Sequence, residues 1–125
     1  MSRNWLPFAA GEVVVVDVRI GTRRYRALLD TGSHVSLVAP DVGFKLGLKD
    51  TGFQAIVGVA GQRRIERAVE LPPIGLASIE LPSCRAAVVE LKHLGLKIQL
   101  ILGVNAFRGR RLQIDFIQSR VYLLE

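Results

Sequence analysis

The sequence has a single cysteine, Cys84, and no long run of apolar residues. One cysteine cannot form a disulfide within the chain, and it argues against a cysteine-based metal site. Apolar runs such as 13–16 and 100–102 are far shorter than the roughly 20 residues that cross a bilayer. No apolar stretch of signal-peptide length follows the N-terminus. We therefore expect a soluble, cytoplasmic protein with no membrane segment.

Aromatic residues are also few, at 6% of the chain, although the net charge is +6. Arginines cluster beside Gly21, Gly61 and Gly109, where turns or helix ends are expected. A basic chain can bind nucleic acid, but no aromatic side chain interleaves with these clusters to stack on bases. We therefore expect no nucleic-acid partner. The alternative, a basic nucleic-acid-binding β-domain, predicts an affinity that falls steeply with salt.

The length and composition predict one all-β domain. A chain of 125 residues with 50% hydrophobic residues suits a single domain over 1–125, with its core at about 12–124. Turn signals recur along the chain between β-branched or alternating segments, which is typical of an all-β barrel or sandwich. Helix is expected only near 40–46 and as a turn at 104–107. Strands are expected at 13–20, 25–29, 55–65 (two runs around a turn), 69–71, 74–81, 84–90, 98–103, 112–116 and 120–124.

Asp30 is the main candidate for chemistry. It directly follows the apolar segment 27–29, where a buried charge is costly unless other groups stabilise it. Thr31 and Ser33 offer hydroxyls, and Gly32 lets the backbone turn so that its amide approaches the carboxylate. Taken alone, the tripeptide is more often an Asx turn at the end of a strand than a catalytic motif. The residues themselves leave both interpretations open.

Two histidines could offer other chemistry. His34 follows Ser33 directly, but adjacent residues on a strand point to opposite faces, so we do not expect a Ser-His-Asp site. His93 lies in a segment expected to be a solvated loop. No cysteine or carboxylate lies at ligand spacing from these histidines, so we predict no zinc or other metal site.

A family resemblance extends the interpretation of Asp30. The segment Leu28-Leu29-Asp30-Thr31-Gly32-Ser33 resembles the active-site motif of aspartic proteases. About 70 residues later, Ile101-Leu102-Gly103 resembles the second signature of that family. Segment 55–68 is placed and composed like the flap hairpin that closes over substrate. The chain over 13–124 thus resembles the single-domain, retropepsin-like aspartic proteases of the retroviral type, in the version found in bacteria. The resemblance implies a closed, β-barrel-like acid protease fold.

The resemblance also implies a function. Such enzymes place two aspartates across a two-fold axis, and we expect one active-site aspartate per chain, so the site needs a homodimer. Asp115 lacks a following Thr-Gly and is not expected to be the second aspartate. The two Asp30 carboxylates would activate water to hydrolyse a peptide or protein substrate, with no metal and no cofactor. The alternative is a catalytically silent peptide-binding or dimerisation module of the same fold.

Neighbouring residues receive roles from the same resemblance. Thr31 is expected to bond to the partner's active-site loop, and Gly32 to bring its amide close to the carboxylate. Ser33 is expected to donate to the outer oxygen of Asp30. The flap tip, expected to admit and then cover an extended substrate, comprises Gly58, Val59, Ala60 and Gly61.

Overall fold

The computed structural model describes residues 3–9, 11, 13–59, 61–95 and 97–124. Within these ranges the protein is built mainly from strands, with one short α-helix and two 3₁₀ turns, which confirms the predicted all-β class. The strands are β1 (Trp5–Pro7), β2 (Val15–Ile20), β3 (Arg23–Leu29), β4 (Ser36–Val38), β5 (Asp50–Val59), β6 (Gln62–Leu71), β7 (Ile74–Leu76), β8 (Ile79–Leu81), β9 (Cys84–Val88), β10 (Leu100–Leu102), β11 (Arg111–Asp115) and β12 (Arg120–Leu124). The helical elements are α1 (Pro40–Lys45), η1 (Lys92–Leu94) and η2 (Val104–Ala106).

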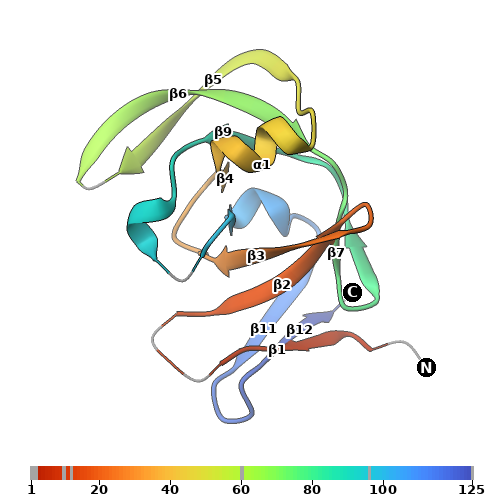
Figure 1. Cartoon of the computed structure of the whole chain (residues 1–125). Coiled ribbons are helices and arrows are strands. Elements are labelled where there is room, and N and C mark those ends of the chain that lie inside the picture. Colours follow the sequence, from red (N-terminus) through yellow and green to blue (C-terminus); the bar gives the residue numbers. More distant parts are fainter. Residues whose placement is uncertain (1–2, 10, 12, 60, 96, 125) are drawn as a thin grey trace.

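The strands form two sheets (Figure 1). One has nine strands in the order β5-β6-β9-β4-β10-β3-β2-β7-β8, and the other has three in the order β1-β12-β11. Buried apolar side chains from both sheets, together with Val42 of α1 and Ala106 of η2, make one contiguous core. None of the described helices is long and apolar enough to cross a membrane.

The predicted closed barrel is wrong, because the large sheet stays open. Its end strands, β5 and β8, do not pair with each other within the described part of the chain. β5 belongs to a hairpin that projects from the sheet, whereas β8 is a strand of three residues at the opposite edge (Figure 1). Strands that diverge in this way cannot close the hydrogen-bond ladder that a barrel requires.

The β2–β3 hairpin shows how the sequence pattern sets the structure. Val16, Val18 and Ile20 alternate with exposed residues, so one face of β2 enters the core. Gly21, with a φ of 62°, allows a two-residue turn that pairs Ile20 with Arg23. β3 therefore begins at Arg23, earlier than the strand predicted at 25–29, because the turn is tighter than the sequence suggested.

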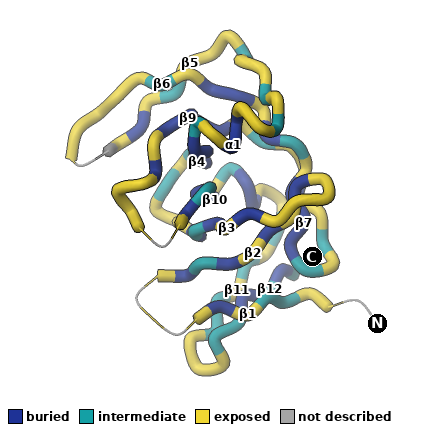
Figure 2. Tube along the Cα trace, in the orientation of Figure 1, coloured by how far each residue is buried: buried dark blue, intermediate teal, exposed yellow. Residues whose placement is uncertain are grey.

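The β5–β6 hairpin is longer than predicted. Each strand has ten residues, whereas the sequence predicted only two short runs within 55–65. Near its base, β6 pairs with β9 and buries Ala68, Val69 and Leu71. Farther out, from Gln54 to Arg67, the hairpin is two-stranded and largely exposed (Figure 2). Most side chains of this part are exposed and only Val57 is fully buried among its described residues, so its sequence lacks the regular alternation that reveals a half-buried strand.

β10 joins distant parts of the chain. It lies between β3, to which it runs parallel, and β4, to which it runs antiparallel. The register places Ile101 beside Leu28 and Leu102 beside Leu29. The second sequence signature therefore lies next to the strand that leads into Asp30.

The core position of Leu71 gives a test of this packing. Leu71 has no exposed surface, so we expect Leu71→Ala to lower the free energy of unfolding by about 2–5 kcal/mol. Ile117 is 96% exposed, and Ile117→Ala should change that free energy by less than about 0.5 kcal/mol. Urea denaturation of both variants measures the difference. Equal losses would contradict the assigned burial.

Candidate active site

Asp30 lies in the loop between β3 and β4, and backbone hydrogen bonds fix this loop. The amide of Asp30 donates to the carbonyl of Leu102 at 3.0 Å, and the amide of Ser33 donates to the carbonyl of Asp30 at 3.1 Å. The amide of Gly32 donates to Oδ1 of Asp30 at 3.0 Å, which is the contact expected of Gly32. The Asp30 side chain is thereby oriented while it remains exposed to solvent.

The predicted role of Ser33 is wrong. Its Oγ donates to the carbonyl of Val35 at 2.7 Å. A serine hydroxyl has one proton to donate, so this bond replaces the expected one to Asp30. Ser33 and Val35 lie only two residues apart, and a local bond of this kind competes readily with a more distant acceptor. The Ser33 side chain therefore closes the loop instead of acting on the carboxylate.

Gly103 supports the loop from the other side. A Cβ at this position would lie 2.6 Å from the carbonyl oxygen of Ser33 and 2.9 Å from that of Val35, closer than real Cβ contacts. The amide of Val104 donates to the same Ser33 carbonyl at 2.8 Å. Only glycine lets the two backbones approach so closely. The two sequence signatures therefore form one structural unit.

A polar network that the sequence prediction missed completes this unit. Ser36 is fully buried, and both its amide and its Oγ donate to Oδ1 of Asn105, at 2.9 and 2.8 Å. The amide of Gly103 donates to Oγ of Ser36 at 3.1 Å, and Nδ2 of Asn105 donates to the carbonyl of Arg85 at 2.7 Å. Asn105 thus ties η2 to β4 and β9. Its signal in the sequence was a lone amide within an apolar stretch.

A cavity of about 430 Å³ opens beside Asp30. Its walls carry Asp30, Gly32 and Ser33 from the loop, together with His34 and His93. The β5–β6 hairpin also contributes to the lining, through Ile56, Val57 and Gly58. The remaining lining residues are aliphatic: Leu28, Val35, Leu37, Val89, Leu91, Leu94 and Ile101.

The structure brings together some of the predicted site residues and separates others. Asp30, Gly32, Ser33, Gly58 and Ile101 line the cavity. Four of the other predicted residues lie around the cavity without belonging to its described lining: Thr31 in the exposed loop, Gly61 in the hairpin turn, and Leu102 and Gly103 behind the Asp30 loop. Val59 is the last residue of β5. The prediction for Ala60 falls outside the described residues.

His93 is exposed, as predicted for a solvated segment, and it also lines the cavity, which the sequence did not predict. His34 and His93 come from different segments, the loop after β3 and η1, and both line the cavity with Asp30. In the described part of the chain, no three His, Cys, Asp or Glu side chains come together in a way that could hold a metal ion. The histidines therefore contribute polar groups to a largely aliphatic cleft.

The prediction of the site left out a second copy of the tripeptide, Asp50-Thr51-Gly52. One contact is the same, because the amide of Gly52 donates to Oδ1 of Asp50 at 2.8 Å. The surroundings differ: this copy begins β5 at an irregularity in the β5–β6 pairing, and Gly52 has a positive φ of 79°. Oγ1 of Thr51 donates to the carbonyl of Ala68, and Asp50 lines a separate cavity. The tripeptide therefore favours the glycine-to-aspartate bond, and the supporting strands decide whether the aspartate faces the cleft.

Known proteins are similar to this chain in both sequence and fold. The family model described as Aspartyl protease matches residues 16–106, so the chain belongs to this family. The fold is similar to a retropepsin-like aspartic protease from Rickettsia conorii, with a TM-score of 0.63 and 13% identity over 95% of this chain and 86% of that one. It is also similar to the retroviral protease-like domain of Ddi1 from Leishmania major, with a TM-score of 0.59 and 20% identity over 94% and 95%. The retropepsin-like resemblance predicted from the two signatures is confirmed.

Two curated proteins are related in sequence. UBA domain-containing protein Mud1 from Schizosaccharomyces pombe is 29% identical over 114 residues, which cover 87% of this chain and 33% of that protein. DNA damage-inducible protein 1 from Neurospora crassa is 24% identical over 126 residues, which cover 98% and 28%. The chain thus spans a third or less of the length of these two relatives.

The tight contact at Gly103 gives a second prediction. We expect Gly103→Ala to force the Asp30 loop to shift and to lower the free energy of unfolding by about 1–3 kcal/mol. Amide NMR shifts of residues 30–35 should change with it. Gly43 in α1 is the matched control, because a Cβ there would meet no atom within 4 Å and alanine favours a helix. Unchanged loop shifts in Gly103→Ala would contradict the role assigned to this glycine.

Cys84, which begins β9, is influenced by the same network. Burial raises the pKa of its thiol above the ordinary value, the polar side chain of Ser36 lowers the pKa in part, and the charge of Glu70 raises it further. A raised pKa means that the folded state holds this proton more tightly than the unfolded state does. Stability from this group is therefore complete below the thiol's unfolded pKa and is lost as the pH rises through the folded pKa.

This sign yields a third prediction. The free energy of unfolding of the wild type should fall more steeply between about pH 8 and pH 10 than that of Cys84→Ala, which lacks the thiol. Urea denaturation at each pH measures both slopes, and comparing the slopes removes any constant cost of the substitution. Equal slopes would show that the thiol titrates alike in the folded and unfolded chains.

Proposed function

We propose that the protein is an aspartic endopeptidase that acts as a homodimer, with Asp30 of each chain in one shared site. The observation that carries this proposal is the oriented, solvent-facing Asp30 at the wall of a cleft with largely aliphatic lining. Membership of the aspartyl protease family supports a peptidase. The pairing of two chains and the catalytic step are inferred from the chemistry.

One chain supplies half of the required chemistry. Among the described residues that line the cleft, Asp30 is the single carboxylate, and Asp50 and Asp115 lie elsewhere. Thr31 is exposed, and its hydroxyl forms no hydrogen bond within the described ranges. An exposed loop with an unused hydroxyl suits contact with an identical loop across a two-fold axis, where each Thr31 bonds to the partner's backbone.

The reaction follows from two carboxylates in close contact. Two such groups cannot both ionise easily, so over a range of pH they share one proton. The ionised Asp30 takes a proton from a bound water, whose oxygen attacks the scissile carbonyl carbon. The protonated Asp30 of the other chain donates to the carbonyl oxygen. Transfer of a proton to the amide nitrogen then breaks the C–N bond and releases two peptides.

The β5–β6 hairpin is suited to serve as the flap. β5 is an end strand of the large sheet, so its outer edge can pair with an extended peptide as an added strand. Ile56, Val57 and Gly58 of this strand line the cleft opposite Asp30. A peptide held there would place apolar side chains against the aliphatic walls, so we expect cleavage beside apolar residues.

Replacement of Asp30 tests the proposal directly. A concentrated, demonstrated dimer should cleave a broad peptide library at some pH between about 3 and 7, the range in which carboxylates titrate. Asp30→Asn should lower kcat/KM by at least about a thousandfold, because neither chain then supplies a carboxylate to take the proton from water. Mass spectrometry of the products measures both activity and cleavage sites.

Asp50→Asn provides a matched control. Asp50 accepts a bond from a glycine amide two residues later, as Asp30 does, but it lies outside the cleft. Its substitution should leave cleavage within about twofold of wild type. If a demonstrated dimer cleaves nothing across the pH range yet binds library peptides, the chain is the silent peptide-binding module instead. Equal losses in both variants would also contradict the role of Asp30.

A further inference from the structure

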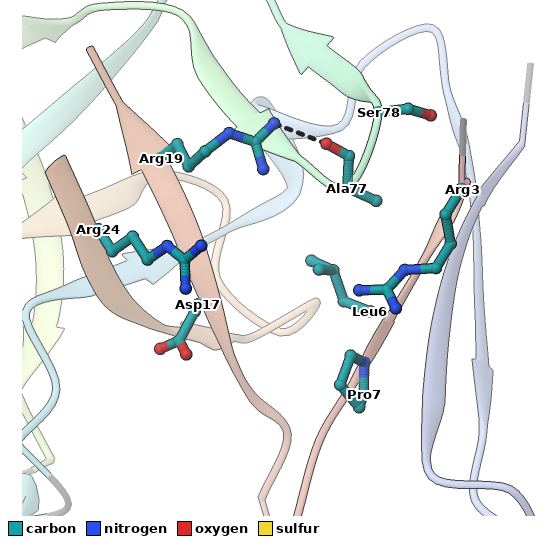
Figure 3. A pocket seen from close by; sticks show the side chains of 8 residues that line it. All are labelled: Arg3, Leu6, Pro7, Asp17, Arg19, Arg24, Ala77 and Ser78. Carbon is teal, nitrogen blue, oxygen red and sulfur yellow. Dashed lines mark hydrogen bonds between the residues drawn. The ribbon is translucent and has the colours of Figure 1, made fainter. Parts of the chain in front are cut away.

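A second cavity lies away from the candidate active site and has a different lining. It encloses about 420 Å³ between β1, the β2–β3 hairpin and the turn that joins β7 to β8 (Figure 3). Three guanidinium groups, those of Arg3, Arg19 and Arg24, line it from three different segments, together with one carboxylate, Asp17. The formal charge of the lining is therefore +2, from three cations and one anion.

Arg19 is held in position by the strand beside it. It pairs with Gly75 of β7, and a Cβ on Gly75 would lie 2.7 Å from Nη2 of Arg19. The guanidinium thus occupies the space that a side chain would fill. Nη2 also donates to the carbonyl of Ala77 at 2.6 Å, the bond drawn in Figure 3. A long surface side chain usually loses rotamer freedom when it binds a ligand, and here that loss has already occurred.

Arg3 is held as well. Its guanidinium lies 4.3 Å from the centre of the Trp5 ring, in a cation–π contact. The carbonyl of Arg3 accepts a bond from the amide of Ser78 at 2.9 Å, which ties this segment to the turn between β7 and β8. Two of the three cations therefore have fixed positions on opposite walls of the cavity.

The third cation adds repulsion that the protein relieves only in part. Arg24 lies directly opposite Arg19 in the β2–β3 ladder, and like charges at such positions destabilise a sheet. The ion pair found within the described residues joins Arg64 to Glu66, far from this cavity in the fold. Asp17 neutralises one charge at most, so an anion from outside would remove the remaining repulsion.

We propose that this cavity binds a small organic dianion, a phosphate monoester or a dicarboxylate. Guanidinium groups match the oxygen pairs of both, and a phosphate monoester carries about −1.5 to −2 charges at pH 7, which balances the lining. Leu6 offers an apolar contact for the rest of the molecule. Arg24 and Asp30 lie at opposite ends of β3, about 20 Å apart along an extended strand, so this site is separate from the cleft.

Titration with two probes tests the proposal. The full chain is titrated with phenyl phosphate and, separately, with succinate, and amide NMR shifts follow binding at constant ionic strength. We expect saturable binding of at least one probe, with shifts at residues 17–24 and 75–78. Arg24→Gln should weaken binding about tenfold or more, because it removes one guanidinium group that can bind two oxygens of the anion. Within the described part of the chain, the Arg24 side chain forms no hydrogen bond or ion pair, and its backbone pairing with Arg19 does not depend on the side chain, so this variant should fold normally.

Arg23→Gln is the matched control. Arg23 is the neighbouring residue on β3 with the same charge, but it does not line the cavity. This variant should bind within about twofold of wild type, because it lowers the net charge of the protein by one without removing a group that lines the cavity. The tighter of the two probes identifies the anionic group, and either result supports the site. Absence of saturable binding for both probes, or equal weakening by both substitutions, would overturn the proposal.

Discussion

The carbonyl of Ser33 and the backbone of Gly103 meet in a space that no side chain could share. This contact joins the loop that carries Asp30 to a segment about 70 residues later, and the surrounding hydrogen bonds depend on it. The carboxylate can face solvent and still keep one orientation because its support is backbone, which has few alternative conformations. Pre-organisation of this kind is what a site for proton transfer requires.

The local features of the site were predictable from sequence, whereas its long-range supports were less so. Alternating apolar residues and the Asp-Thr-Gly turn depend on neighbours in the chain, so they are visible in the sequence. The second Asp-Thr-Gly, at Asp50, makes the same glycine-to-aspartate bond but lies at a different cavity. The tripeptide alone therefore does not predict which strands surround it. The network around Asn105 joins residues 69 positions apart, so the sequence near either residue does not reveal it. The Ser33 hydroxyl makes a local bond instead, which the family resemblance did not predict. The open edges of the large sheet are likewise a property of the assembled strands.

For the arginines too, the sequence predicts their local setting but not their neighbours in the fold. The sequence predicts them at turns, where solvated side chains are usual. Arg19 and Arg24 instead sit opposite each other across the β2–β3 hairpin, and Gly75 makes room for one of them. Charge density on this face thus arises from strand register and not from a local cluster. The two cavities divide the molecule chemically, with aliphatic walls around Asp30 and cationic walls at the other end of β3.

The small sheet brings the two ends of the described chain together. β1 pairs with β12, and the amide of Leu123 donates to the carbonyl of Asn4 at 2.9 Å (Figure 1). Neither β1 nor β12 contributes a residue to the described lining of the cleft beside Asp30. The domain is consequently a good substrate for circular permutation: a short linker could join the ends, and new ends could open at an exposed turn, with every strand pair kept.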